Sequence, residues 1–191
     1  MAITSGIFSE EVRFEERLKP SLDELAKTVE HLKGIGLKIV LTSGSFDLIH
    51  LGHVKYLAKA KALGDVLVVG VDSDAKIRRR KGEDRPLVPE QERLEMLAHQ
   101  RPVDLLYLKP DDEERWGLIR AVEPDVLVLT ADHTYSEQEQ AELGEIVGSI
   151  EILERQATIT TSERIRQLYM HLGERLAEVL PDLVRDLVRQ R

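Results

Sequence analysis

Five short runs of apolar residues, separated by amphipathic segments, constrain the fold of this chain more than any other feature. Four of them are apolar nearly throughout: KIVLT (38–42), DVLVVGV (65–71), VDLLYL (103–108) and PDVLVLT (124–130). SIEIL (149–153) is a fifth candidate strand. Strands without polar alternation are typical of parallel sheets that helices cover on both faces. We therefore predict an α/β fold of the Rossmann-like, doubly wound type with a mainly parallel five-stranded sheet.

The segments between these runs carry apolar residues at helical spacing. In SLDELAKTVEHLKGIG (21–36), Ser21 and Glu24 form a capping-box pattern, and the two glycines end the helix. The other predicted helices are HLGHVKYLAKAKALG (50–64), VPEQERLEMLAHQ (88–100) with Pro89 in its first turn, DEERWGLIRAV (112–122), and TTSERIRQLYMHL (160–172) with Thr160 and Glu163 as a capping box.

The composition limits the partners of the chain. Its 191 residues carry a net charge of −8 and no cysteine. The charge argues against a protein that coats nucleic acid or membrane, and the missing cysteines exclude disulfides and a cysteine nucleophile. We expect a cytoplasmic protein, because the sequence has no signal-peptide pattern and no membrane-spanning apolar run. The expected parts are an N-terminal extension with a lead-in helix (1–35), a main domain (36–172) and a C-terminal amphipathic helix (173–191).

The C-terminal segment GERLAEVLPDLVRDLVRQR (173–191) has its apolar residues on one side of a helix. Two interpretations stay open. The helix docks on its own domain, which we favour, or it contacts a second copy in a homodimer. Pro181 is expected to kink this helix or split it in two.

The stretch SGSFDLIHLGH (43–53) follows the first predicted strand, at the edge where parallel sheets bind ligands. Gly44 permits close backbone approach, and a helix starting near Gly52 directs N–H groups and a positive dipole toward an anion. His50 and His53 are three residues apart and share a face at that helix start. A lone histidine is more often a packing residue, but this pair in this position favours a phosphate site.

These residues also carry a resemblance. GSFDLIHLGHVKYL (44–57) resembles the G-x-F-D-x-x-H-x-G-H-x-x-x-L motif of the cytidylyltransferase-like nucleotidyltransferases. KGEDRPLVPEQERLEML (81–97) resembles the family's K-G-x-x-R-P loop and its arginine helix, and TITTSERI (158–165) stands where the family has S-T-T-x-I-I. From about Ser21 to Leu172 the chain is similar to the adenylyltransferase domain of bifunctional heptose kinase/adenylyltransferases.

The resemblance implies a function and a set of site residues. The implied reaction is magnesium-dependent transfer of a nucleotide, AMP from ATP in preference to CMP from CTP, to a small phosphorylated acceptor such as a sugar phosphate. The catalytic residues would be His50, His53 and Lys81, and Asp47 would lie near the phosphates or bind their magnesium ion. The implied nucleotide-binding residues are Ser43, Gly44, Ser45, Phe46, Asp47, Gly52, Arg93, Asp132, Thr160, Thr161 and Ser162.

Several of these residues have simpler explanations. Alone, the basic run KIRRRKG (76–82) indicates a solvated loop or a weak nucleic-acid patch, but its place after the second strand favours a loop that faces a triphosphate. Arg93 has Glu90 and Glu92 as possible ion-pair partners, and helix capping alone explains the Thr-Thr-Ser run. The histidines that we predict to be surface or structural residues are His31, His99 and His171.

The loop after the fourth predicted strand departs from the family pattern. The family has Lys-Gly-Gly-Asp-Tyr where this chain has Leu129-Thr130-Ala131-Asp132-His133, so the lysine and both glycines are replaced. Ser43 and Ser45, on either side of the first glycine of the histidine motif, also depart from the heptose adenylyltransferase subfamily, which has asparagine and cysteine at these positions. Two alternatives therefore stay open: a cytidylyltransferase acting on glycerol or polyol phosphate, and a non-catalytic nucleotide-binding sensor.

Overall fold

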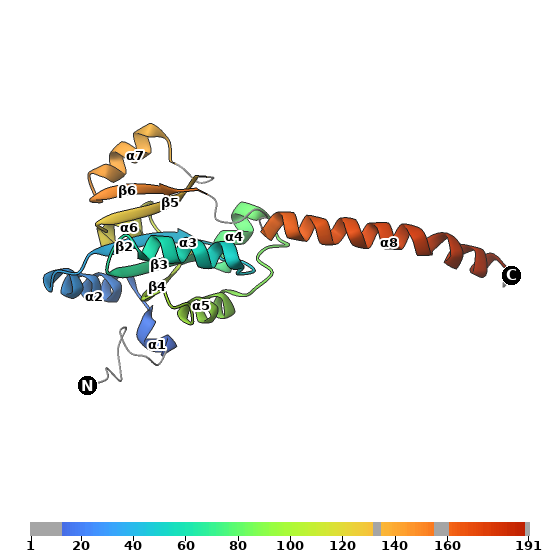
Figure 1. Cartoon of the computed structure of the whole chain (residues 1–191), viewed down its shortest axis with the longest axis horizontal. Helices are drawn as coiled ribbons and strands as arrows, with labels where there is room; N and C mark the ends of the chain where they lie inside the picture. The colour runs from blue at the N-terminus through green and yellow to red at the C-terminus, as the bar shows by residue number, and fades with distance from the viewer. Residues whose placement is uncertain (1–12, 132–134, 155–160, 190–191) are drawn as a thin grey trace. The chain divides into compact units, whose positions relative to one another are not determined.

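One parallel sheet contains every strand in the described parts of the chain (Figure 1). This computed structural model describes residues 13–131, 135–154 and 161–189, and the chain divides into two compact units, Met1–Gln156 and Ala157–Arg191. In spatial order the strands are β1 (Leu18–Lys19), β4 (Leu105–Lys109), β3 (Val66–Asp72), β2 (Ile39–Gly44), β5 (Val126–Thr130) and β6 (Ser149–Leu153).

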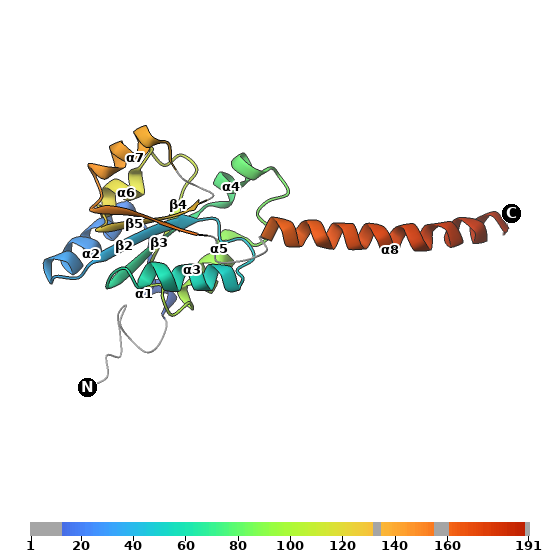
Figure 2. The ribbon, with the colours of Figure 1, turned by 45° about the horizontal axis from the view of Figure 1, so that its top comes forward.

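Helices cover both faces of this sheet, as the apolar runs predict. The helices of the first unit are α1 (Phe14–Arg17), α2 (Leu22–Gly34), α3 (Leu51–Lys61), α4 (Asp74–Lys81), α5 (Glu90–Ala98), α6 (Gly117–Val122) and α7 (Glu137–Gly144). One apolar cluster joins α2, α6 and α7 to one face of the strands, and a second joins α3 and α5 to the other (Figure 2). The doubly wound α/β prediction is confirmed.

The structure corrects four details of the sequence-based expectations. The sheet has six strands instead of five, because the two residues of β1 pair with β4 and are too few to show a periodicity. The basic run after β3 is the helix α4 rather than a loop. Residues 112–116 lie outside α6, which begins at Gly117. Finally, α7 was not expected, since only Leu143 of this helix is buried.

The predicted capping chemistry is confirmed at the start of α2. Ser21 Oγ accepts a hydrogen bond from Glu24 N at 3.2 Å, so Ser21 is the N-cap of α2. Pro89 is the residue before the first turn of α5 rather than within it. The predicted pairing of Thr160 with Glu163 lies outside the described residues.

The second unit contains a single long helix, α8 (Thr161–Arg189). It continues through Pro181, so the proline does not split it, and it also passes through the domain boundary expected after Leu172. The expected three-part division of the chain stays a prediction. Large apolar side chains along α8 are exposed, among them Leu168, Leu172, Leu176, Val179 and Leu180.

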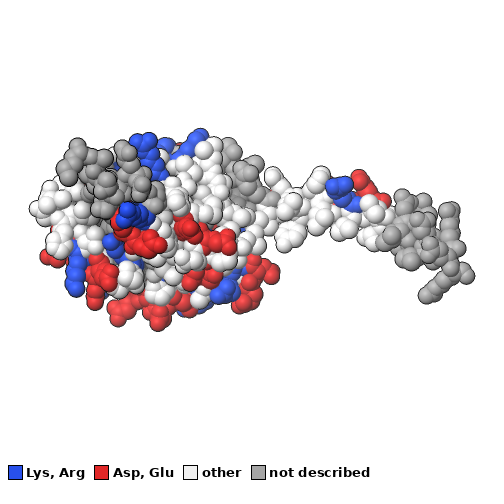
Figure 3. Space-filling model, turned by 90° about the horizontal axis from the view of Figure 1, so that it is seen from below, with Lys and Arg blue, Asp and Glu red and all other residues white. Residues whose placement is uncertain are grey.

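Acidic side chains cover more of the described surface than basic ones on the face seen in Figure 3. This agrees with the net charge of −8. No helix in the described parts of the chain is long and apolar enough to cross a membrane.

Candidate functional site

The turn between β2 and α3 brings the histidine motif to the carboxyl edge of the sheet. Phe46 and Leu48 both adopt left-handed backbone conformations, with φ of 49° and 54°. Such conformations are strained for residues with a side chain and are concentrated at functional sites. A Cβ on Gly44 would lie 3.1 Å from Phe46 Cε2, so the glycine leaves room for the ring to fold back over the strand end.

His50 and His53 form a structural pair at the start of α3. His50 is the N-cap residue, and its Nδ1 accepts a hydrogen bond from Gly52 N at 3.0 Å. His53 Nδ1 accepts one from His50 N at 3.3 Å, and the two ring centroids lie 4.1 Å apart. Because both Nδ1 atoms act as acceptors, the proton of each neutral ring resides on Nε2. Both rings can therefore donate an N–H to an anion at the helix start.

The electrostatic surroundings keep His53 uncharged. Burial, the neighbouring His50 and the Lys81 ammonium lower the pKa of His53 to about 4, and the Asp47 carboxylate opposes the shift. The interaction with Lys81 links the last residue of α4 to the histidine pair. His50, His53 and Lys81, the three predicted catalytic residues, therefore belong to one electrostatic cluster.

Asp47 connects this turn to the segment that follows α4. Its carboxylate is almost fully buried and forms an ion pair with Arg85. Oδ1 accepts from Leu87 N and Val88 N at 3.1 and 3.0 Å, and Oδ2 accepts from Leu87 N at 3.1 Å. Arg85 Nε is buried and has no hydrogen-bond partner among the described residues. Arg85 is the arginine of the K-G-x-x-R-P loop and is not among the residues named from the sequence. Its ion pair with Asp47 adds it to the candidate site.

Two arginines of α4 are paired with residues of neighbouring elements. Arg80 donates to Ser45 Oγ at 2.7 Å and to Asp72 Oδ2 at 2.9 Å, which ties α4 to the ends of β2 and β3. Arg79 pairs with Asp111 at 3.0 Å. Desolvation and the charges of Arg80 and Arg85 lower the pKa of Lys81, and Asp47 and Asp72 oppose the shift.

Arg93 is fully buried at the centre of these loops. Its guanidinium donates to the carbonyl oxygens of Ser45, Asp72 and Val88 and to the carboxylate of Asp74. These contacts use four of its five N–H donors. The alternative pairing with Glu90 or Glu92 is absent from these contacts, and the implied contact with nucleotide phosphates stays a prediction.

The remaining implied residues divide into two groups. Ser43 and Gly44 end β2, Ser45 lies in the turn that follows, and Gly52 is buried in the first turn of α3. Asp132 and Thr160 lie outside the described residues. Thr161 and Ser162 begin α8, and their side chains are outside the described set.

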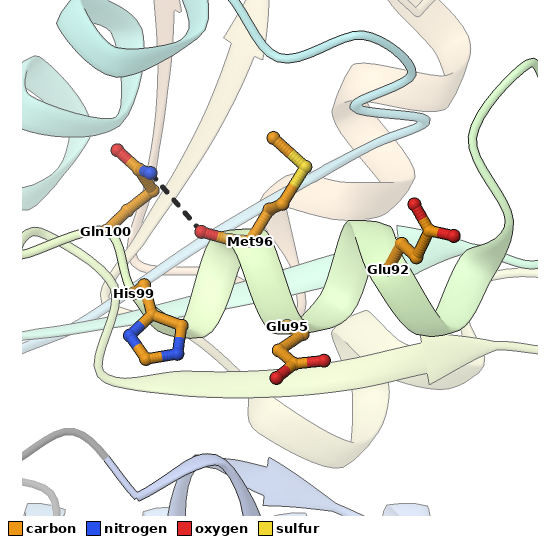
Figure 4. Close-up of a pocket in the computed structure, with 5 residues that line it drawn as sticks. All are labelled: Glu92, Glu95, Met96, His99 and Gln100. Carbon is orange, nitrogen blue, oxygen red and sulfur yellow. Dashed lines mark hydrogen bonds between the residues drawn. The ribbon is translucent and has the colours of Figure 1, made fainter.

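A hollow on α5 is separate from these residues. Glu92, Glu95, Met96, His99 and Gln100 line it, and Gln100 Nε2 donates to Met96 O at 3.2 Å (Figure 4). None of these is an implied site residue. Its two carboxylates would repel a triphosphate, so we do not assign the nucleotide to this hollow.

Comparison with known proteins establishes the family. The sequence profile described as cytidylyltransferase-like matches residues 41–179. The chain belongs to this family. It is 41% identical over 152 residues to the bifunctional protein HldE of Nitratiruptor sp. and 50% identical over 114 residues to that of Geobacter metallireducens. These matches cover 80% and 60% of the chain but 32% and 23% of the relatives, so the chain spans about a third or less of their length.

Two solved structures share the fold of this cytidylyltransferase-like chain. A lipopolysaccharide core biosynthesis protein from Thermoplasma volcanium has a TM-score of 0.53 and 30% identity, covering 63% of this chain and 97% of its own. A pantoate-beta-alanine ligase from Francisella tularensis has a TM-score of 0.51 at 16% identity, covering 72% of this chain and 66% of its own. The second likeness concerns the fold alone.

Nucleotidyltransferases generally use divalent metal ions, which are held by carboxylate oxygens and phosphates. The described residues contain no group of three or more histidine or acidic side chains that would ligate a metal. Both Asp47 oxygens already accept two contacts, from Arg85, Leu87 and Val88, and Asp72 accepts from Arg80. Because the carboxylates of Asp47 and Asp72 are already engaged, they fit a magnesium ion that takes most of its ligands from the triphosphate and from water. Asp47 as a metal ligand stays a prediction and would require residues 85–88 to release its carboxylate.

The depressed pKa of His53 predicts a pH dependence of stability. In the unfolded chain His53 gains a proton below its ordinary pKa near 6.5, whereas in the folded chain it does so only near pH 4. The free energy of unfolding should therefore fall as the pH falls from 6.5 to 4. After allowance for solvent screening we expect about 1–2 kcal/mol from this group. Urea unfolding of wild type and His53→Gln at neutral and acidic pH measures it.

The His53→Gln variant should show a weaker loss of stability at acidic pH than wild type. The exposed His99 provides the matched control, because His99→Gln should retain the wild-type pH dependence. An equal pH dependence in all three proteins would contradict the assignment.

The contacts of Arg93 predict a large effect on stability. Arg93→Met leaves two strand-end carbonyl groups and the Asp74 carboxylate without their donor, so the free energy of unfolding should fall by about 3 kcal/mol. Denaturant unfolding measures this, with the exposed Arg120→Met as control. Unchanged stability combined with lost ATP binding would instead show that Arg93 acts on the phosphates.

Proposed function

We propose that this chain is a nucleotidyltransferase that transfers AMP from ATP to a small sugar phosphate and releases pyrophosphate. The observation that carries this proposal is the pair His50 and His53 at the start of α3, with both Nδ1 atoms held as acceptors and the Lys81 charge acting on them. Membership of the cytidylyltransferase-like family supports the reaction class. The resemblance to heptose adenylyltransferase domains and the likeness to a lipopolysaccharide core biosynthesis protein support the sugar phosphate.

The reaction is a single displacement at phosphorus. An acceptor phosphate oxygen forms a bond to the α-phosphorus of ATP, and the bond from that phosphorus to the oxygen bridging to the β-phosphate breaks. Pyrophosphate leaves with the electron pair, and no enzyme group bonds covalently to the nucleotide. Negative charge grows on the departing phosphates, and hydrogen-bond donors already aimed at that position stabilise it.

The residues of the site supply these donors. The Nε2–H groups of His50 and His53 donate to phosphate oxygens at the start of α3, where the positive end of the helix dipole also favours an anion. Lys81 adds an ammonium donor, and the contacts of Asp47 and Arg93 hold the loops around it. Magnesium is the divalent ion of this proposal, and when bound to the triphosphate it neutralises part of the phosphate charge.

The proposal also includes the setting of the protein. An acidic chain without a long apolar helix in its described parts is suited to the cytoplasm, with ATP and a phosphorylated sugar as its partners rather than nucleic acid or a membrane.

Loss of a histidine donor should lower turnover far more than stability. His50→Asn keeps an N-cap side chain that accepts from the helix start but removes the Nε2–H, so kcat should fall by about 100- to 1,000-fold. Pyrophosphate release from ATP and from CTP, with a panel of sugar, glycerol and polyol phosphates, measures this. His99→Asn, an exposed change on another helix, should leave kcat unaltered.

The same panel distinguishes the alternatives. Faster release from CTP with glycerol or polyol phosphate would replace the proposed substrates by those of a cytidylyltransferase. Tight ATP binding without pyrophosphate release from any acceptor would indicate a nucleotide sensor. Full activity of His50→Asn in a working assay would contradict the mechanism.

We further propose that α8 mediates a homodimer. Its apolar residues recur at spacings of three, four and four at Ile165, Leu168, Leu172, Leu176, Val179, Leu183 and Leu187. This eleven-residue repeat stays on one face of a nearly straight helix, which is the pattern of helices that pair along their length. Figure 3 shows mainly uncharged side chains along the described part of α8. A second α8 presents the same apolar line and is therefore a matching partner.

Charged substitutions on this line should dissociate the dimer. Leu176→Glu with Val179→Glu places four charges in the shared apolar seam, so the dimer dissociation constant should rise at least about 100-fold. Sedimentation equilibrium measures this, with Arg175→Ala as the control because Arg175 is off the line. A monomeric wild type would contradict the proposal and favour docking of the helix on its own domain.

A further inference from the structure

Arg17 is a buried cation that no step of the proposed function uses. It is the last residue of α1, directly before β1, and it is 7% exposed. Burial lowers the pKa of its guanidinium, and the Asp104 carboxylate opposes this shift. Taking a charge out of water is costly, so the contacts of Arg17 have to offset that cost. The residue also precedes the region that the family profile matches, which begins at residue 41.

The guanidinium of Arg17 caps the carboxyl end of α5, which lies beside α1 (Figure 1). Its Nη1 donates to Ala98 O at 2.7 Å and to Val103 O at 2.6 Å, with a longer contact to Gln100 O at 3.4 Å. Carbonyl groups at the end of a helix have no partner within it, and a cation there complements the helix dipole. Because α5 has no basic residue in its own last turn, Arg17 supplies this cap from another element.

The turn that Arg17 contacts is itself fixed to the sheet. Asp104 follows Val103, and its Oδ2 accepts from Leu67 N at 2.6 Å and from Lys61 Nζ at 2.5 Å. Leu67 belongs to β3 and Lys61 ends α3. Arg17 therefore joins the end of α5 to a turn that is anchored on the neighbouring strand and helix.

The opposite end of α5 holds the candidate site together. Arg93, in the first turn of this helix, donates to the carbonyl oxygens of Ser45 and Asp72. Glu90 Oε2 accepts from Asp74 N at 2.7 Å, which fixes the first residue of α4. A helix of nine residues is marginal in isolation, so the contacts at its two ends set its position. A displacement of α5 would shift the β2 turn and the start of α4 together.

We propose that Arg17 is a positioning residue for the candidate phosphate site and acts through α5. By fixing the carboxyl end of this short helix, it keeps Arg93 and Glu90 in contact with the β2 turn and the start of α4. The segment before α2 is then part of the functional unit. The inference rests on the proposed function in its choice of ATP as the ligand, whereas the coupling itself is a property of the folded chain.

Binding of a non-hydrolysable ATP analogue tests this coupling without relying on turnover. Arg17→Met keeps an unbranched side chain and removes the donors, so the dissociation constant of the analogue should rise about 3- to 10-fold. Arg17→Lys retains a cation without the planar fork, so it should restore part of the affinity. Calorimetric titration of the full chain measures this, at a temperature where thermal unfolding shows each variant to be folded.

A matched control separates positioning from a general loss of stability. Leu32→Ala removes a buried side chain from the apolar cluster on the other face of the sheet, so it lowers the thermal midpoint without touching α5. The folded Leu32→Ala chain should bind the analogue as the wild type does.

Amide hydrogen exchange follows the same coupling in the absence of any ligand. In Arg17→Met the amide of Asp74, which donates to Glu90 of α5, should exchange at least about fivefold faster than in the wild type. The amide of Ile39, which donates to Asp125 Oδ2, is the internal control. In Leu32→Ala the ratio of the two exchange rates should equal that of the wild type.

Unchanged Asp74 exchange or unchanged analogue affinity in Arg17→Met would overturn the inference, and so would an equal loss of affinity in Leu32→Ala. A wild type that binds no ATP analogue would reject the proposed function, and the exchange rates alone would then decide the role of Arg17. Affinities that follow the expected pattern without pyrophosphate release would also reject the proposed function and leave the positioning role in place.

Discussion

The guanidinium of Arg93 is the contact on which the geometry of the carboxyl edge depends. A buried cation is costly to desolvate, and here carbonyl oxygens at the ends of β2 and β3, together with Val88 O and Asp74, offset that cost. Backbone carbonyls at strand ends have no partner within the sheet, so the arginine satisfies groups that would otherwise need water. One side chain thereby fixes the β2 turn and the start of α4 to the same helix.

Asp47 performs the same task with the opposite charge. Its carboxylate gathers backbone N–H groups and Arg85 from the segment after α4, while Arg93 gathers carbonyl groups from the strand ends. The two buried charges lie on adjoining loops and each is neutralised by its own contacts. Because these groups are engaged in holding the loops, the proposed function assigns the chemistry to other side chains: His50, His53 and Lys81. In that proposal, the residues that shape the site differ from those that contact the phosphates.

The sequence predicts the elements whose signal is local and misses those that depend on tertiary contacts. The apolar runs locate β2 to β5 because strands buried on both faces carry apolar residues at nearly every position. The edge strand β6 is largely exposed, and its SIEIL run is correspondingly less apolar. By contrast, Ile77 is the one buried residue of α4, and the four residues after it are all arginine or lysine. One apolar residue sets no periodicity, so the sequence does not indicate this helix. The two residues of β1 are too short for any pattern.

In the candidate site, too, the sequence predicts what is local and misses what depends on tertiary contacts. The histidine motif is contiguous, so its place at a helix start follows from the strand before it and the spacing within it. The partners of Arg93 come from residues 45, 72, 74 and 88 and follow only from the folded arrangement of three loops. The ion pair of Asp47 with Arg85 likewise joins residues 38 positions apart and follows only from the folded arrangement.

The strand order places the histidine motif where parallel sheets bind ligands. All paired strands run parallel, and the order of the strands changes direction at β2, with β3 and β4 on one side and β5 and β6 on the other. Ligands of parallel sheets bind beyond the carboxyl ends of the strands at such a switch point. In the proposed reaction two phosphate groups approach each other there, and they repel by about 4 kcal/mol per pair of unit charges at 4 Å near a protein surface. The groups that we propose to offset this repulsion are the Nε2–H donors of His50 and His53 and the Lys81 ammonium, whose charge acts on His53.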